Sequence, residues 1–224
     1  CGGAGKRCLE IAREWSVERE QWGKPVGEHE AVAEKLGWMA SHLFAMEAIV
    51  SLTSAWVDQG KLDIRIEAAM AKLFGSEAVW KIVDETLQIR GGRGYETADS
   101  LKGRGEKPIP VERIFRDLRI NLIIEGTSEV MRLFLAREAL DPHIQVAFDM
   151  ILPKTALPKR IRAVFRASSF YVRWYPKMWL PSLGGVPAEL PASLRGHWAF
   201  VERTSRRLGR TLFHQMVLYR EKLE

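Results

Sequence analysis

The sequence predicts an all-α protein, with an up-down four-helix-bundle-like domain over residues 1–145 and a basic helical extension over 146–224. Apolar residues recur at helical spacing along most of the first 140 residues, and no convincing alternating strand pattern occurs. The charge changes along the chain, because residues 146–224 hold 14 Lys and Arg against 5 Asp and Glu, whereas residues 1–145 hold 20 against 23. This asymmetry places the expected domain boundary near residue 145.

The helices of the first domain follow from their apolar stripes and from the residues that interrupt them. Residues 3–19 place Cys8, Ile11 and Trp15 on one face, and the segment QWGKPVGEH then ends the helix with Gly and Pro. The next stripe repeats at intervals of four and three residues, which is typical of antiparallel helices packed at a shallow angle. The predicted helices cover residues 3–19, 30–57, 63–89, 111–124 and 128–139.

The composition changes after Asp141-Pro142, where Pro, Arg and aromatic residues are mixed and only a last helix, over 194–222, is predicted. The whole chain is 46% apolar and 28% charged, as is usual for a soluble globular protein, and no apolar run reaches about 18 residues. Cys1 and Cys8 are expected to be reduced thiols, and neither CxxC nor HExxH spacing indicates a metal site. Because the chain lacks an initiator Met, we expect a fragment, and the missing targeting segment says nothing about location.

The stretch NLIIEGTSEVMRLF, residues 121–134, places the acidic Glu125 after three apolar residues and before a glycine. A carboxylate at the C-terminal end of a helix is mildly unfavourable, although Thr127 can cap the next helix and Glu129 suits its first turn. The apolar neighbours could also desolvate Glu125 and raise its pKa toward the range of a general base. From the residues alone, Glu125 is either a surface carboxylate at a helix end or a base.

Two further motifs have both a structural and a functional interpretation. The GGRG of residues 91–94 follows a helix rather than a strand, so it fits neither a Rossmann nor a P-loop motif. It either terminates the helix or lets the backbone approach a phosphate or a neighbouring subunit. Arg19 lies where the first helix breaks, and is either an exposed side chain or an anion ligand beside Trp22.

Three motifs in this order and spacing, VEREQWGKPVGEH, LQIRGGRGYE and RIFRDLRINLIIEGTSEVMRLFLAR, resemble the C-terminal helical domain of flavin-dependent acyl-CoA dehydrogenases. The likeness covers about residues 1–140. It implies that Glu125 removes a proton alpha to an acyl-CoA thioester carbonyl while a hydride leaves the beta carbon for FAD, which gives the trans-2-enoyl-CoA. It further implies that the main-chain N–H of Glu125 helps to stabilise the forming enolate. The implied electron acceptor is electron-transfer flavoprotein, although an oxidase that uses oxygen is not distinguished.

The resemblance also implies roles for further residues, position by position. Gly126 would admit the thioester and Arg137 would lie near the substrate. The flavin contacts would be Arg19, Gln21, Trp22 (where the family has Phe), Thr127 and Glu129, and the adenosine-diphosphate end of FAD would meet Gln88, Gly91 and Gly92. In the family that FAD is bound mainly by a neighbouring subunit, which implies a homodimer or a higher homo-oligomer. The family's N-terminal helical domain and middle β-domain are not in this sequence, so we expect residues 1–224 alone to bind FAD weakly or not at all.

The basic extension, residues 146–224, resembles in position the extra C-terminal region of very-long-chain members of the family. It is either a solvated helical appendage or a surface for anionic lipid, because arginines alternate there with aromatic residues. Nucleic-acid binding shares the charge but has no motif here. A non-catalytic helical module for membrane or partner contact is the alternative function. The resemblance implies a cytoplasmic location in a bacterium, and the mitochondrial matrix or inner-membrane surface in a eukaryote.

Overall fold

The computed structural model describes residues 1–60, 63–151, 156–180 and 185–219, which form two compact units, 1–135 and 136–224. Each unit is described by itself. The boundary between the units lies within the long helix α7 (Ser128–Ile151). Residue 145, where the charge predicts a domain boundary, lies in the same helix, and that boundary stays a prediction. The described residues are almost entirely helical, so the predicted all-α class is confirmed.

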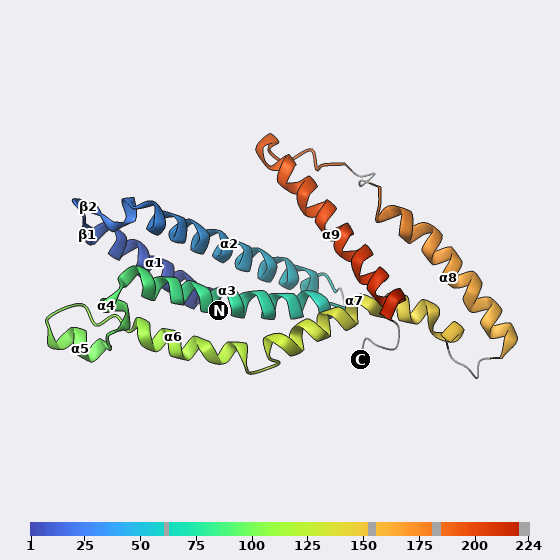
Figure 1. The fold of residues 1–224 in the computed structure, drawn as a ribbon, viewed down its shortest axis with the longest axis horizontal. Coiled ribbons are helices and arrows are strands. Elements are labelled where there is room, and N and C mark those ends of the chain that lie inside the picture. Colours follow the sequence, from blue (N-terminus) through green and yellow to red (C-terminus); the bar gives the residue numbers. More distant parts are fainter. Residues whose placement is uncertain (61–62, 152–155, 181–184, 220–224) are drawn as a thin grey trace. The chain divides into compact units, whose positions relative to one another are not determined.

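The first unit is organised around the helix α3 (Arg65–Arg90), which contacts α1 (Gly2–Glu18), α2 (Glu30–Asp58) and α6 (Val111–Arg119). Figure 1 shows α2 and α3 running side by side, with α6 along the other side of α3. The core between the helices is apolar and includes Cys8 and Ile11 of α1, Met39 and Leu43 of α2, and Val79, Ile82 and Val83 of α3. Cys8, Ile11, Met39, Leu43 and Val83 belong to the apolar stripes from which the helices were predicted. Val79 and Ile82 do not, and Ile66 and Met70, which were predicted for the apolar face of α3, are exposed.

Short elements connect these helices. The strands β1 (Glu20–Gln21) and β2 (Lys24–Pro25) form an antiparallel hairpin that was not predicted, and a 3₁₀ turn (Val26–Glu28) follows it. The helices α4 (Gly92–Tyr95) and α5 (Ala98–Gly103) lie between α3 and α6. The predicted helix over 111–124 is wrong at its end, because α6 stops at Arg119 and a 3₁₀ turn (Ile120–Leu122) takes its place.

The helix α2 is the one helix among the described residues that is long and apolar enough to cross a membrane. The core helix of a soluble protein passes the same test of length and composition. One face of α2 buries Met39, Leu43 and Met46 against α1 and α3, and these are the three buried residues of this helix. Other apolar side chains of α2 remain exposed, among them Phe44, Val50, Leu52 and Val57.

The second unit contains the rest of α7, α8 (Leu157–Lys177) and α9 (Ala192–Tyr219). Its interior is aromatic: the ring of His143 lies 4.6 Å from that of Trp174 and 5.3 Å from that of Phe213. Burial lowers the pKa of His143 by disfavouring the charged imidazolium. Arg206 and Arg210 of α9 donate hydrogen bonds of 3.1 and 2.8 Å to the carbonyls of Lys177 and Met178, at the end of α8.

Three predictions for the later helices need correction. The helix predicted over 128–139 extends to Ile151 and contains Pro142, so the proline does not end it. The helix α8 was not predicted, because its Pro and Arg residues obscured the apolar period. The last helix begins at Ala192 rather than at residue 194, and residues 220–222 of the prediction lie outside the described residues.

Candidate functional site

The β1–β2 hairpin turns at Trp22 and Gly23, whose φ angles are +51° and +80°. Positive φ at both central residues defines a tight hairpin turn that Asn-Gly usually occupies, so a bulky Trp there is a strained choice. The turn leaves Trp22 88% exposed, with its indole edge-on to the ring of His29 at 5.4 Å. The N–H of Val26 donates to the carbonyl of Arg19 at 2.7 Å, which ties the hairpin to the end of α1.

The helix α3 ends in the second predicted motif. Gly91 has φ +58° and ψ −137°, a conformation that residues with a side chain rarely adopt. Gly94 packs against the last turn of α3, where a Cβ atom would lie 2.6 Å from the carbonyl oxygen of Leu87. The motif therefore ends the helix, as one of its two interpretations predicted, and it leaves the backbone at Gly91 and Gly92 without side chains.

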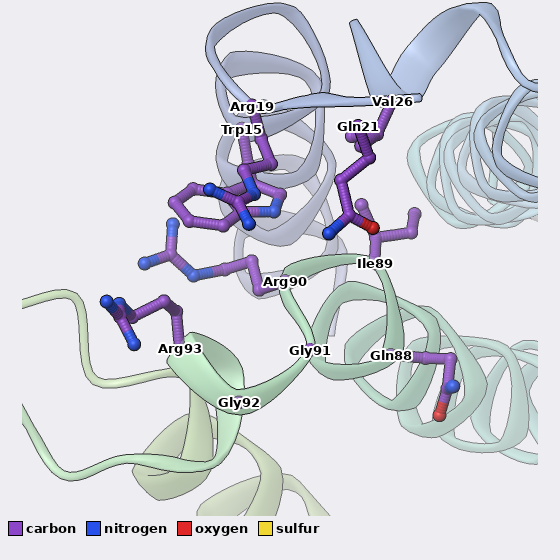
Figure 2. Close-up of a pocket in the computed structure, with 10 residues that line it drawn as sticks. All are labelled: Trp15, Arg19, Gln21, Val26, Gln88, Ile89, Arg90, Gly91, Gly92 and Arg93. Atoms are coloured by element: carbon purple, nitrogen blue, oxygen red, sulfur yellow. The ribbon is translucent and has the colours of Figure 1, made fainter. Parts of the chain in front are cut away.

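A pocket of about 360 Å³ lies between the hairpin and the end of α3. Its lining includes five of the residues predicted to contact FAD, namely Arg19, Gln21, Gln88, Gly91 and Gly92. Figure 2 shows Arg19 and Gln21 above the turn at Gly91, whereas the Gln88 amide extends away from the arginines. Trp22 does not line the pocket.

The rest of the lining was not predicted to bind a ligand, and consists of Trp15, Val26, Ile89, Arg90 and Arg93. Arg90 is only 6% exposed, and its guanidinium lies 4.7 Å from the centre of the Trp15 ring. Burial lowers the pKa of Arg90, although Glu106 opposes the shift. Arg93 differs, because it pairs with Glu106 at 2.7 Å and with Glu96 at 3.4 Å. In the sequence, the only feature that could have indicated a role for Arg90 and Arg93 is their position on either side of Gly91 and Gly92.

Glu125 lies on a tight turn between α6 and α7. Its φ is +55° and that of Gly126 is +95°, so two consecutive residues adopt a left-handed conformation. Lys72 of α3 donates a hydrogen bond from Nζ to the carbonyl oxygen of Gly126. The hydroxyl oxygen of Thr127 accepts a hydrogen bond from the N–H of Val130 at 3.3 Å, so the predicted cap of the next helix is confirmed. The turn is therefore held from α3 on one side and from α7 on the other.

The Glu125 side chain is exposed, and Ile123 and Ile124 are about half-exposed. The desolvation expected from these apolar neighbours is therefore not supplied by this chain alone. Among the described residues, the Glu125 carboxylate has no ion pair and its main-chain N–H has no hydrogen-bond acceptor. Such a carboxylate is free to accept a proton, and the N–H is free to donate to a ligand.

Two further residues predicted from the resemblance, Glu129 and Arg137, lie on α7 and do not line the pocket. Glu129 lies in the first turn of α7, where hydrogen bonds from its own N–H and from Thr127 lower the pKa of its carboxyl. Arg137 is exposed on the part of α7 that belongs to the second unit, so it is described apart from Glu125. No group of three or more His, Cys, Asp and Glu side chains in the described ranges could hold a metal ion.

A helical bundle that displays an unpaired carboxylate at one turn and an arginine-lined pocket at another has the parts expected of a domain in a flavin-dependent acyl-CoA enzyme. The chain belongs to the acyl-CoA dehydrogenase family, because residues 1–140 match the family model "Acyl-CoA dehydrogenase, C-terminal domain". It is similar to the Mycobacterium tuberculosis protein named "Probable acyl-CoA dehydrogenase FadE10", with 52% identity over 224 residues. This match covers 99% of the chain and 34% of the relative.

Other relatives match a shorter part of the chain. The very long-chain specific acyl-CoA dehydrogenase of Bos taurus mitochondria is 41% identical over 134 residues, which are 60% of this chain and 19% of that protein. The structure of butyryl-CoA dehydrogenase from Megasphaera elsdenii aligns with a TM-score of 0.55 and 29% identity, over 62% of this chain and 33% of that one. The chain thus spans about a third or less of the length of these relatives. The match to FadE10 includes the basic extension, residues 146–224.

Proposed function

We propose that this chain supplies the catalytic base of an FAD-dependent acyl-CoA dehydrogenase, which converts acyl-CoA thioesters to trans-2-enoyl-CoA. The observation that carries the proposal is the exposed, unpaired carboxylate of Glu125 on a left-handed turn held from two helices. FAD, when bound, accepts the hydride that leaves the beta carbon of the substrate. The named relatives that are acyl-CoA dehydrogenases support this assignment.

Glu125 would take the alpha proton of the thioester onto its carboxylate. This proton is weakly acidic, so the base must be close and the negative charge that develops on the carbonyl oxygen must be stabilised. The unbonded N–H of Glu125 is a suitable donor to that oxygen. Gly126 would leave room for the thioester, and the exposed state of Glu125 in this chain allows the remainder of the protein to complete the walls of the site.

The pocket fits the adenosine-diphosphate end of FAD, because it joins arginine side chains to glycine backbone that a ligand can approach. Helix α3 separates this pocket from the base: Lys72, which holds the Glu125 turn, and Gln88, which lines the pocket, are about 24 Å apart at 1.5 Å per residue. We therefore assign the pocket to the FAD of a neighbouring subunit, in at least a homodimer. The exposed apolar side chains of α2 supply a surface for that association.

The test uses the whole protein, with flavin absorbance followed as acyl-CoAs of increasing length are added. Glu125→Gln should keep flavin bound but abolish its bleaching by substrate, whereas Glu34→Gln, an exposed change on α2, should leave bleaching unchanged. Normal flavin reduction in Glu125→Gln would show that the base is another residue. Turnover with electron-transfer flavoprotein rather than with oxygen supports the dehydrogenase over an oxidase.

A second proposal concerns the extension, where α8 combines an exposed apolar face with an entirely basic charge. Its exposed apolar residues lie on one side of the helix and include Leu157, Ile161, Val164, Phe165 and Val172. The helix carries six Lys and Arg and no Asp or Glu. This pattern is typical of helices that lie on anionic membranes. Membrane contact through α8 would also be the function of the chain if it were a non-catalytic helical module.

This second proposal is tested by co-sedimentation with anionic and with neutral vesicles. Binding should depend on anionic lipid and should fall when Phe165, which is 74% exposed, is replaced by Asp. The matched control is Ser169→Asp, which adds the same charge on the same helix at an exposed polar position outside the span of these apolar residues. If both variants bind vesicles as the unmodified protein does, α8 is a solvated appendage.

A further inference from the structure

The turn that carries Glu125 is a strained piece of backbone. Among the described residues, only Trp22 and Glu125 have a side chain together with a positive φ, which is +55° at Glu125. A residue with a side chain adopts this left-handed conformation only where the surrounding structure holds it there. The cap formed by Thr127 holds the start of α7, but it involves no group of Glu125 or Gly126, the two left-handed residues.

Lys72 of α3 supplies the bond that the cap does not. Its Nζ donates a hydrogen bond to the carbonyl oxygen of Gly126. In the part of the chain that the structure describes, no other hydrogen bond joins residues 120–127 to a helix other than the flanking α6 and α7. Lys72 is half-buried and has no ion pair among the described residues, so its ammonium is committed to this carbonyl. A hydrogen bond from a charged donor contributes more than one between neutral groups.

The bond to the carbonyl leaves the Glu125 carboxylate free. An ion pair with Lys72 would favour the ionised carboxylate, lower its pKa and weaken it as a base. The two side chains form no such pair, so Lys72 holds the backbone that carries the base without occupying the base itself. A second link between α3 and α7, the ion pair of Glu77 with Arg132, is exposed, and exposed pairs contribute little to stability.

We propose that Lys72 is a positioning residue for the base: it anchors the left-handed turn so that the Glu125 carboxylate meets the alpha carbon of the thioester. The proposal rests on the proposed function for the identity of the reaction. Lys72 acts through the backbone of Gly126 and needs no contact with flavin or substrate. Because an error of about 1 Å in the position of a reacting group can lower a rate about 100-fold, one such anchor can matter to the reaction.

The first experiment measures flavin reduction by acyl-CoA in the whole protein, on the flavin-bound fraction. Lys72→Met keeps the apolar stem and removes the ammonium, so the limiting rate should fall roughly 10- to 100-fold. The acyl-CoA concentration that gives half of this rate should change less than about twofold, because the substrate contacts remain. Lys72→Arg, which keeps a charged donor, should recover part of the rate.

The matched control is Lys81→Met, which removes an exposed lysine from the same helix. Lys81 follows Lys72 by about two and a half helical turns, so it lies on the opposite side of α3 from the Glu125 turn. This variant should keep the unmodified limiting rate. If Lys72→Met also keeps that rate and loses only thermal stability, Lys72 is structural and the proposal is wrong. If Lys72→Met does not fold, Lys72→Gln, with a neutral donor of shorter reach, is judged by the same outcomes.

The second experiment asks whether Lys72 acts through the turn. Gly126→Ala displaces the same turn, so the double variant with Lys72→Met should lose less than the product of the two separate losses in rate. A loss equal to the product would show that Lys72 acts elsewhere and would overturn the proposal. Failure of the proposed function looks different, because Glu125→Gln would then reduce flavin normally. Failure of the positioning role alone leaves Glu125→Gln inactive and Lys72→Met fully active.

Discussion

Replacement of Gly126 by Ala tests whether the left-handed turn is what positions Glu125. Gly126 has φ +95°, and an added Cβ atom would lie 2.8 Å from Sδ of Met131. The backbone strain of a non-glycine residue in this region costs about 1–2 kcal/mol. The close contact adds about 1 kcal/mol, at the lower end for overpacking, because Sδ belongs to a flexible side chain that can move.

The matched control is Gly105→Ala. Gly105 also has a positive φ, +77°, but nothing lies within 4 Å of an added Cβ atom, so this variant carries the backbone strain alone. Urea denaturation should therefore show Gly126→Ala to be less stable than Gly105→Ala by about 1 kcal/mol.

The same pair of variants separates stability from function. Gly126→Ala displaces the turn that carries Glu125, so the rate of flavin reduction by acyl-CoA should fall at least about tenfold, which corresponds to about 1.4 kcal/mol in the barrier. The reduction rate is measured on the flavin-bound fraction, because Thr127 and Glu129, which follow Gly126, are expected to contact the flavin. Equal stability and equal reduction rates in the two variants would refute the reasoning.

Three further outcomes follow from named residues. Trp22→Asn should stabilise the hairpin by up to about 1 kcal/mol, since Asn tolerates positive φ, while lowering the flavin content of the purified protein; a loss of stability in urea would contradict it. Because burial lowers the folded-state pKa of His143 below 6.5, protons bind the unfolded chain first, so thermal stability should fall as the pH drops below about 6.5, and His143→Phe should flatten that dependence. Burial raises the pKa of Cys8 to about 11, so a thiol reagent at pH 8 should label the exposed Cys1 and should label Cys8 only after denaturation.

The sequence was sufficient for the helices that form the core, because their apolar residues repeat with the period of the helix. The helix predicted over 30–57 is present as Glu30–Asp58, and that over 63–89 as Arg65–Arg90. The sequence was not sufficient to determine where a helix ends. The apolar residues among 120–124 continue the helical pattern, yet α6 stops at Arg119, where the side chain of Asn121 donates a hydrogen bond to the carbonyl of Leu118 at 3.3 Å.

The candidate site was predictable in its residues but not in its geometry. Five of the residues that the resemblance assigns to FAD line one pocket, yet the resemblance gave no sign that Arg90 would be buried there without an ion pair among the described residues. That property depends on the packing of Trp15 from another helix, which no local pattern reveals. Trp22 is expected to contact FAD, and the structure exposes it on the hairpin turn, outside the lining of the pocket, so this contact stays a prediction.

The position of α3 supports the proposed association between chains. The same helix holds the Glu125 turn through Lys72 and forms the pocket at its C-terminal end, so the two are about 24 Å apart and cannot approach each other without unfolding it. A ligand bound in the pocket and reacting at the base of the same chain would have to follow the helix along that length. If each pocket instead serves the flavin of a second chain, no such span is needed, and the exposed apolar residues of α2 would be covered in the same step.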